Sequence, residues 1–444
     1  MVDKIIFLVY NHNGFLFGVQ RGVNMKNDLT NTEPKKIAVI GGGAAGMMAA
    51  IKAAESGADV TIFERGDRMG KKLRITGKGR CNVTNNCDNE ELLSNIPRNP
   101  RFLYTAINTF GVSDVMAFFE GEGVPLKTER GKRVFPQSDK AADIVAAMVK
   151  KCKSVGCKII NERVGRLYAK DGKITGISVG GRLYSFDSVI LATGGMSYPG
   201  TGSDGDGYRM AKELGHTVTE LTPSLVPIVE DGHFCSKMQG LSLKNVGFSV
   251  IDERCGKTVY TDFGEMMFTH FGMTGPMILS ASAHLKDIAK GIYRAEIDLK
   301  PALDEKILDA RILSDFSKNT NKDFLNSIGG LLPQKMIEPI IALSGIDARK
   351  KVNSVTKEER KRLLHLLKHL PVPLLRFRPI DEAIITSGGI STKEISPKTM
   401  ESKLIEGLYF AGEIIDVDGY TGGFNLQIAF STAALAGMSA AEKY

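Results

Sequence analysis

The residues best suited to chemistry near the amino end are the glycines of Gly41–Gly46, which read GGGAAG and match the spacing G-x-G-x-x-G. Glycines at this spacing let backbone N–H groups approach a pyrophosphate, and the amino end of a following helix stabilises its negative charge. Glu64 follows Gly43 by 21 residues, where a ribose needs a hydrogen-bond acceptor. Because this residue is acidic, the pattern favours FAD or NAD over NADP.

These residues need a strand, a turn, a helix and a second strand to position them. Lys36–Ile40 (KIAVI) is a short apolar run typical of a buried parallel strand, and it leads directly into the glycines. An Ala- and Met-rich helix is expected to follow to about Ser56, where Gly57 stops it. Asp59–Phe63 (DVTIF) has the pattern of the second strand, and Glu64 follows directly at its carboxyl end. This order of elements makes the dinucleotide prediction specific.

Two further segments favour FAD over NAD. Gly70–Asn85 (GKKLRITGKGRCNVTN) combines glycines with five Lys and Arg residues. A loop around a pyrophosphate and flavin edge is favoured here over a solvated charged face, because the segment follows the dinucleotide unit directly. Gly407–Asp416 has the pattern of a strand, a turn and an acid, and Gly422–Gly437 adds a Gly-rich turn and a small-residue helix. Such a carboxyl-terminal element suits a two-part FAD site, and NAD dehydrogenases do not need it.

Seven sequence blocks between Lys36 and Tyr444 form a specific pattern: IGGGAAGMMAA, GKGRCNVTN, RVFPQSDKA, ATGG, GDGYRMAKELGH, GEMMFTHFGMTGP and GLYFAGEIIDVDGYTGGFNLQIA. The pattern resembles a bacterial family of FAD-dependent oxidoreductases, described as aminoacetone-oxidase-like or NAD(P)/FAD-dependent, of which one branch reduces bile-acid enones. The GDGY block also resembles, more weakly, flavoprotein subunits of the fumarate reductase type. In such proteins the first glycine motif holds the ADP moiety, and the carboxyl-terminal block closes over the flavin.

The resemblance implies FAD contacts at the positions that match the family's motifs. The pyrophosphate, adenosine ribose and adenine would be held by Gly41, Gly43, Ala45, Gly46, Glu64, Arg65, Val164, Thr193 and Gly194. The other side of the cofactor, with its ribitol and isoalloxazine, would be lined by Lys72, Gly77, Arg80, Cys81, Asn82, Gly412, Glu413, Asp416, Asn425, Leu426, Gln427 and Ala429.

The implied fold class is α/β, with a doubly wound, Rossmann-like FAD domain of the glutathione-reductase type that an insert splits. Alternating runs such as VGFSVI at 246–251 predict a small β-rich unit, and the stretch after it has helical spacing. Leu370–Pro373 is expected to be the linker back to the FAD domain. The expected parts are an amino-terminal extension (1–35), a first FAD part (36–216), a β-rich insert (217–302), a helical subdomain (303–373) and a second FAD part (374–444).

Composition places the chain among globular proteins. Its 444 residues are 43% hydrophobic and 24% charged, which excludes disordered and fibrous classes, and no apolar run reaches the length of a membrane span. The six cysteines form no C-x-x-C pair, so neither a disulfide scaffold nor a metal site is expected, and a reduced, cytoplasmic setting fits best. Met25 would be a natural start, so Met1–Asn24 is expected to be an upstream extension or a loosely attached edge segment.

Three residues are candidates for catalysis. His270 precedes a Gly-rich turn, where an imidazole can donate a proton to a reduced substrate. Tyr198 and Tyr420 stand beside glycines in loops expected to flank the flavin. Cys152 and Cys157 have the C-x4-C spacing of flavin disulfide reductases, but they are far from the first helix in sequence, so ordinary buried cysteines are expected.

The resemblance implies that hydride passes from NAD(P)H through FAD to a small organic acceptor such as an activated C=C, with amine oxidation by oxygen as an alternative. Gly200–Gly205 repeats the glycine spacing, but Asp204 and Asp206 would repel phosphate, so NAD(P)H is expected to dock transiently over the flavin. Arg349–Arg378 is strongly basic but lacks interleaved aromatic residues, so a solvated helix face is favoured over a nucleic-acid surface. A flavin-containing RNA-modifying protein is the second alternative, and the substrate and oligomeric state stay open.

Overall fold

The computed structural model describes residues 33–442, and the chain from Lys35 onward forms one compact unit. The stretch Met1–Asn24, expected to be an upstream extension, lies outside the described residues. Between residues 33 and 442 no single helix is long and apolar enough to cross a membrane, and one bent pair, Pro100–Thr109 with Val112–Gly121, has the length and composition for it.

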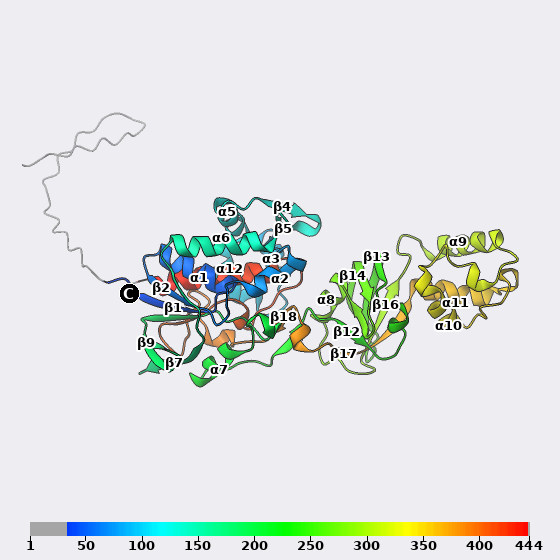
Figure 1. Ribbon diagram of the computed structural model, residues 1–444. Coiled ribbons are helices and arrows are strands. Elements are labelled where there is room, and N and C mark those ends of the chain that lie inside the picture. The colour runs from blue at the N-terminus through cyan, green and yellow to red at the C-terminus, as the bar shows by residue number, and fades with distance from the viewer. Residues whose placement is uncertain (1–32, 443–444) are drawn as a thin grey trace, which may run out of the picture. The chain divides into compact units, whose positions relative to one another are not determined.

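A parallel five-stranded sheet is built from the first and last parts of the chain, in the order β19-β10-β1-β2-β6 (Figure 1). Its inner strands are almost wholly apolar and buried, as expected when both faces of a parallel sheet are covered. The two strands predicted on either side of the glycine turn are confirmed. The strands are β1 (Lys36–Ile40), β2 (Asp59–Phe63), β6 (Lys158–Ile160), β10 (Ser188–Leu191) and β19 (Leu408–Phe410).

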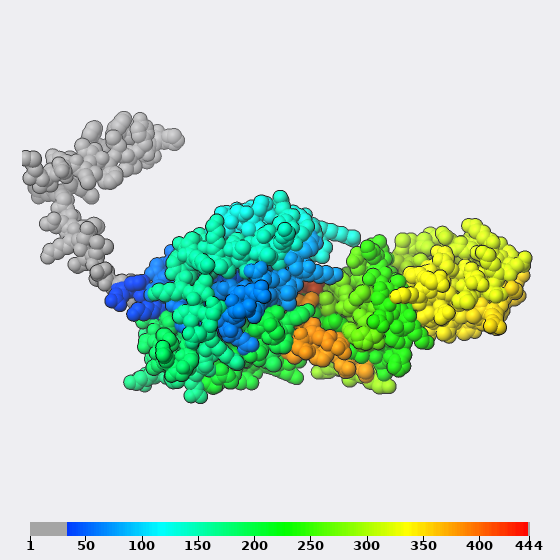
Figure 2. Space-filling view, in the orientation of Figure 1, coloured from blue at the N-terminus to red at the C-terminus, as the bar shows by residue number. Residues whose placement is uncertain are grey.

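Helices α1 (Ala44–Glu55), α6 (Ala141–Ser154) and α12 (Phe424–Ala441) lie together on one face of this sheet (Figure 1). Small residues let α1 and α12 approach closely, because a Cβ on Gly437 would lie only 2.3 Å from the Ala49 carbonyl oxygen. Nearly every residue of α12 is buried, and Figure 2 shows almost none of this carboxyl-terminal segment (red) at the surface on the face drawn. The small-residue helix predicted after Gly422 is therefore a central packing element.

An antiparallel meander occupies the other side of the sheet in Figure 1. It consists of β7 (Val164–Lys170), β8 (Lys173–Val179) and β9 (Arg182–Ser185), which pair in sequence order. Gly172 and Gly181 adopt positive φ at the two turns, as tight hairpins require. The remaining elements of this half are α2 (Lys71–Gly79), β3 (Thr84–Asn85), α3 (Asn89–Ser94), α4 (Tyr104–Thr109), α5 (Val112–Gly121), β4 (Leu126–Glu129), β5 (Arg133–Pro136) and α7 (Asp206–Glu213).

The basic segment Gly70–Asn85 differs from the loop expected for it. It contains helix α2, whose helical geometry breaks at Thr76, Gly77 and Lys78. Gly77 and Lys78 both adopt left-handed backbone angles, which strain a residue that carries a side chain. Too few apolar residues lie in this charged run for a helical period to be visible in the sequence.

The middle of the chain forms a closed six-stranded barrel in the order β12-β15-β14-β13-β16-β17. Val246, Phe248 and Val250 are buried at alternate positions, so the strand signal of VGFSVI is confirmed. The paired strands β11 (Thr222–Ser224) and β18 (Ile385–Ser387) lie at the two crossings between the barrel and the sheet-bearing half. The barrel strands are β12 (Ile228–Glu230), β13 (Ser242–Asp252), β14 (Lys257–Phe268), β15 (Gly272–Thr274), β16 (Tyr293–Asp298) and β17 (Leu370–Phe377), and helix α8 (Pro276–Ser282) follows β15.

The expected linker Leu370–Pro373 is wrong, because these residues belong to β17, which pairs with β12 and β16 and closes the barrel. Three buried aliphatic residues alternate with the two prolines, so the strand period of two is preserved despite the prolines that suggested a linker. The helical subdomain therefore ends at Lys368, and the expected boundary at residue 373 falls inside a barrel strand.

Three helices, α9 (Glu305–Lys318), α10 (Gln334–Ser344) and α11 (Lys357–Lys368), form the helical subdomain between β16 and β17 (yellow in Figure 1). Their apolar faces and the barrel interior form one buried cluster, and a second cluster surrounds the parallel sheet. The barrel and the helices thus share a core, although their secondary structure differs.

Candidate active site

A cavity of about 840 Å³ opens at the carboxyl ends of β1, β2 and β10, where Ile40, Phe63 and Ala192 line it. Open α/β sheets bind ligands in this crevice, and ligand sites usually measure ~300–1,000 Å³. Glu265 and Leu279 of the barrel line the same cavity. The cavity therefore has one end on the parallel sheet and another on the barrel.

Two glycines of the turn are needed for close packing, whereas a third is open to a ligand. Gly41 has a φ of 104°, and a Cβ there would lie 2.5 Å from the Ala192 carbonyl oxygen. A Cβ on Gly46 would lie 1.8 Å from the Gly41 carbonyl oxygen, whereas a Cβ on Gly43 would meet nothing within 4 Å. Gly43 also lines the cavity at the amino end of α1, where the first N–H groups have no partner inside the helix. This end of α1 suits a pyrophosphate.

Glu64 stands at the cavity wall, where the sequence predicts an acceptor for a ribose. Its two carboxylate oxygens accept the backbone N–H groups of Gly42 and Gly66, each at 2.7 Å, and these bonds fix its orientation. Beside it, the Arg65 guanidinium pairs with the Asp204 carboxylate. Asp204 belongs to the second glycine-rich segment, which therefore forms part of the wall of the first nucleotide site.

Three buried polar atoms of cavity-lining residues have no hydrogen-bond partner within residues 33–442. They are Thr193 Oγ1, Asn82 Oδ1 and Asn85 Oδ1. Buried polar groups in folded proteins are nearly always paired, so this group of atoms indicates a polar ligand. Together with the open end of α1 and the Glu64 carboxylate, they fit a cofactor that carries a pyrophosphate, a ribose and a polar ring system, as FAD does.

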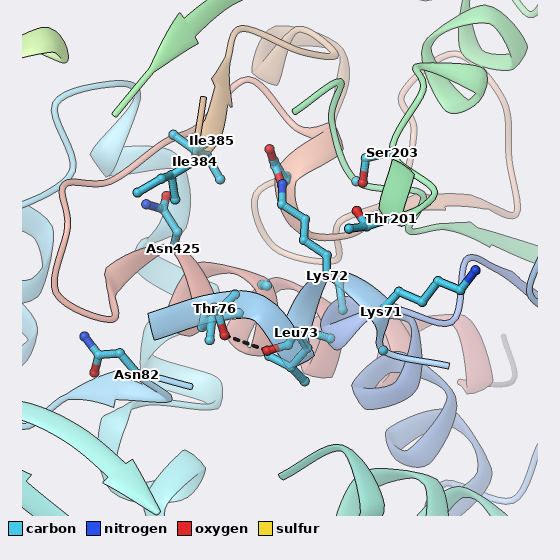
Figure 3. A pocket seen from close by; sticks show the side chains of 18 of the residues that line it. Lys71, Lys72, Leu73, Thr76, Asn82, Thr201, Ser203, Ile384, Ile385 and Asn425 are labelled. Carbon is cyan, nitrogen blue, oxygen red and sulfur yellow. Dashed lines mark hydrogen bonds and ion pairs between the residues drawn. The ribbon is translucent and has the colours of Figure 1, made fainter. Parts of the chain in front are cut away.

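The Lys72 side chain extends from α2 to Glu413, in the last part of the chain. Its ammonium donates to the Ser197 hydroxyl and to the Glu413 carboxylate, each at 2.7 Å. Glu413 also accepts the Thr386 N–H at 2.9 Å. Figure 3 shows the Lys72 and Lys71 side chains leaving α2 in different directions, although both residues line the cavity. The Lys72–Glu413 pair thus joins two cavity walls that are far apart in sequence.

Most of the residues expected to contact FAD line this cavity: Gly41, Gly43, Ala45, Glu64, Arg65, Lys72, Gly77, Arg80, Asn82, Val164, Thr193, Gly194, Glu413, Asn425, Leu426 and Ala429. Gly46, Cys81, Gly412, Asp416 and Gln427 are not among the lining residues. Gly412 packs against α1, because a Cβ there would lie 2.7 Å from the Ala45 Cβ. Cys81 is fully buried, and burial raises the pKa of its thiol to about 12.

Asp416 and Gln427 have internal partners instead. The Asp416 carboxylate pairs with the Arg98 guanidinium and accepts the side-chain N–H of Asn99 at 3.3 Å. Gln427 is fully buried, and its side-chain oxygen accepts the Thr84 hydroxyl at 2.6 Å. Both residues tie the carboxyl-terminal segment to the region after α2, a role that their motif did not reveal.

The structure brings one of the three predicted catalytic residues to the cavity. Tyr420 lines it, whereas His270 and Tyr198 do not. His270 is exposed in the turn between β14 and β15. Tyr198 is also exposed and has a φ of 52° at the start of a short 3-10 turn. The turn after Tyr198 reaches the cavity through Thr201 and Gly202, although Tyr198 itself does not line it.

Cys152 and Cys157 are buried, as expected from the sequence. Their thiols donate to the carbonyl oxygens of Met47 and Ala50 in α1, at 3.7 and 3.6 Å. Neither cysteine lines the cavity, which agrees with a packing role.

Sequence reasoning missed His284, which stacks on Tyr420. The two rings lie 4.6 Å apart at an angle of 17°, and the Tyr420 hydroxyl is 3.4 Å from His284 Nδ1. The Tyr260 ring also packs against His284, with ring centroids 4.7 Å apart, and its hydroxyl donates to Asp262 at 2.8 Å. His284 follows α8 in an ordinary stretch, Ser-Ala-His-Leu, so only the packing of the barrel against the carboxyl-terminal loop identifies it.

Burial sets the protonation of this pair. It lowers the pKa of His284, so the imidazole is neutral at pH 7. It also raises the pKa of Tyr420, and the nearby Asp418 carboxylate raises it further. Asp418 is itself buried, and burial raises its pKa although the hydroxyls of Ser224 and Ser387 donate to it. Tyr420 is therefore a phenol that keeps its proton well above neutral pH.

The barrel end of the cavity is largely apolar. Leu279, Ile384 and Ile385 line it, and Figure 3 shows the two isoleucines among the residues of the cavity wall. Glu265 adds a carboxylate to this end. An apolar wall with a few polar groups is typical of sites for small rings.

Comparisons with known proteins agree with this geometry. The family model described as "HI0933-like protein Rossmann domain" matches residues 35–439. The 3-dehydro-bile acid delta(4,6)-reductase of Clostridium scindens is 31% identical over 416 residues, which cover 92% of this chain and 99% of that protein. A ribosomal RNA dihydrouridine synthase of Haemophilus influenzae is 32% identical over 412 residues, or 90% of this chain and 97% of that protein.

Among solved structures, a flavocytochrome c3 fumarate reductase is 17% identical to this chain and has a TM-score of 0.46. The match covers 92% of this chain and 78% of the fumarate reductase chain. The family match, the relatives and the sheet-bound cavity all agree on one assignment. The chain belongs to the HI0933-like Rossmann-domain family and is an FAD-dependent oxidoreductase.

Proposed function

We propose that this enzyme reduces a carbon–carbon double bond that is conjugated to a carbonyl group. The names of two relatives support this class of reaction, since one is a delta(4,6)-reductase of a 3-dehydro bile acid and the other forms dihydrouridine in ribosomal RNA. Both reactions add a hydride and a proton across a C=C that a carbonyl polarises. When bound, FAD supplies the hydride chemistry.

The observation that carries the proposal is Tyr420 on the cavity wall, with its hydroxyl 3.4 Å from His284 Nδ1. After hydride addition to the carbon remote from the carbonyl, the adjacent carbon needs a proton. Tyr420 holds that proton at neutral pH. The neutral His284 imidazole can pass a replacement proton from solvent to it, by donating from one ring nitrogen while the other accepts. General acid catalysis of this kind contributes ~10²–10⁴-fold to a rate.

The walls around Tyr420 suit a flat acceptor. Leu279, Ile384 and Ile385 offer apolar contacts to a ring face, and they keep water from the reacting carbons. Glu265 offers carboxylate oxygens that can accept a ring N–H group. A steroid enone and a uracil base both match this combination of apolar faces and polar edges.

The electron donor in this proposal is NAD(P)H, docked transiently over the flavin. Gly202, Ser203 and Asp204 line the same cavity as Gly43, so the second glycine-rich segment adds to the first nucleotide site. NAD(P)H would therefore enter the cavity through the same opening as the substrate. Reduction of FAD and reduction of the substrate would then alternate.

Anaerobic half-reactions of the FAD-loaded protein test the proposal. NADH and NADPH are added separately while the flavin absorbance is followed, and the reduced protein is then mixed with a 4,6-dien-3-one steroid or with a uridine-containing RNA. We expect one nicotinamide to bleach the flavin and one acceptor to restore its colour. If neither acceptor restores the colour, and a primary amine alone bleaches the flavin, the alternative of an amine oxidase is correct.

A further inference from the structure

Positive charge is concentrated near the end of the helical subdomain. Residues 349–378 contain ten Lys and Arg against two Glu, an excess equal to the net charge of +8 for the whole chain. Half of these basic side chains have acidic partners and hold the helices and barrel together: Lys350 with Glu359, Lys351 with Asp323, Arg360 with Asp309, Lys368 with Asp298 and Arg378 with Glu382. The solvated face expected from the sequence is thus only part of this stretch.

Three other cations form what we name the basic face of α11: Lys357, Lys361 and Arg362. All three are exposed, and none of them forms an ion pair with an acidic side chain of the described part of the chain. Lys357 and Lys361 are four residues apart and lie on one side of the helix, and Arg362 lies on the adjoining part of its exposed surface, while Leu363 and Leu367 are buried on the other side.

The acids of α11 leave this face positive. Glu359 is occupied, because it pairs with Lys350 and accepts the backbone N–H of Thr356 in a capping box. Glu358 is the acid that acts electrostatically on the two lysines of the face. Arg362 Nε donates to the Ser344 carbonyl oxygen at 3.1 Å, which holds the guanidinium in place.

We propose that the basic face of α11 binds RNA phosphates and steadies an RNA whose uridine base enters the cavity. The proposal rests on the proposed function. No residue of 303–369 lines the cavity, so this contact is separate from the chemistry, and a small enone in the cavity would not touch it. Phosphate contacts fix the position of a nucleic acid, and contacts to the base select the site.

The test is the affinity of the full FAD-loaded chain for a fluorescein-labelled, uridine-containing RNA hairpin, followed by anisotropy over a series of salt concentrations. The face variant is Lys357→Glu/Lys361→Glu/Arg362→Glu. The matched control is Lys150→Glu/Lys170→Glu/Arg182→Glu, which changes the net charge equally at three exposed positions. Thermal melting and FAD absorbance are measured to check that both variants fold.

We expect the face variant to bind the hairpin at least ~10-fold more weakly and to lose about two to three units of the log–log salt slope, because three phosphate contacts are removed. The control should change affinity by less than ~3-fold. Equal losses in both variants, or no binding by the unaltered chain at low salt, would overturn the proposal. Turnover of a dienone steroid reports the proposed function separately, since both variants should keep it.

Discussion

Tyr420 and His284 are 136 residues apart in sequence, and they stack where the barrel meets the loop before α12. Glycines beside Tyr420 predicted a flavin-flanking position for it, and in the structure it lines the cavity. His284 had no such signal, because an isolated histidine after a short helix is ordinary. Residues that meet only through tertiary packing between two cores cannot be paired from local sequence patterns.

We expect Tyr420→Phe to slow the reoxidation of reduced flavin by a conjugated enone ~10²-fold or more, because the proton donor is lost. Reduction of the flavin by NAD(P)H should change little, since that step needs no proton from Tyr420. Stopped-flow absorbance measures both half-reactions. Tyr198→Phe is the matched control, as Tyr198 lies outside the cavity, and an equal loss in both variants would exclude the role of Tyr420.

The pH dependence of this half-reaction follows from the raised pKa of Tyr420. A phenol with a raised pKa keeps its proton below that pKa, so the rate should stay level through pH 9 and fall only above about pH 10. Asp418→Asn removes a negative charge that raises this pKa, so the alkaline fall should move to lower pH. A profile that falls between pH 7 and 8 in the unaltered enzyme would contradict the assignment.

The Lys72–Glu413 pair should be needed for tight FAD binding. Lys72→Met leaves the Glu413 carboxylate half-buried without its cation, which costs about 1–3 kcal/mol. We therefore expect a lower melting temperature and weaker FAD retention. Adding Glu413→Gln should recover much of the stability, and a double-mutant cycle gives the coupling between the two residues. Strictly additive effects would show that the pair is not coupled.

At the scale of elements, the strand–glycine–helix–strand unit was predictable because it is encoded by residues that are neighbours in sequence. The strand β17 was not, because its two prolines hide an alternating pattern that only pairing in a closed barrel makes clear. The helix α2 was missed for a different reason, since a charged run gives no apolar period. Tertiary context decided both elements.

In the glycine turn, a methyl group added at one glycine should affect packing, and a methyl group added at another should affect FAD binding. Gly46→Ala would place a Cβ 1.8 Å from a backbone oxygen, so we expect the FAD-free protein to lose about 1–3 kcal/mol of stability. Gly43→Ala has open space and an extended backbone, so its melting temperature should hardly change while FAD binds more weakly. Melting curves and FAD titration compare the two variants, and a stability loss in Gly43→Ala would contradict this division.

At the scale of the whole molecule, one cavity joins two hydrophobic cores. The core around the parallel sheet supplies the glycine turn, Glu64 and Lys72, and the barrel supplies Glu265, Leu279 and the support for Tyr420. The resemblance to the flavoprotein family implied a split nucleotide domain with an insert, and the strand pattern of 246–251 supported it. The residues at the barrel end of the cavity could not be predicted, because that end is made by contacts across the two cores.

The most direct measurement is an anaerobic absorbance titration of the purified, FAD-loaded protein. We expect bound flavin that NADH or NADPH bleaches, and whose colour returns without oxygen when a dienone steroid or a uridine-containing RNA is added, with one C=C of the acceptor reduced per flavin. Reduced flavin that only oxygen reoxidises, with no C=C reduced in either acceptor, would contradict the proposal that this enzyme reduces conjugated double bonds.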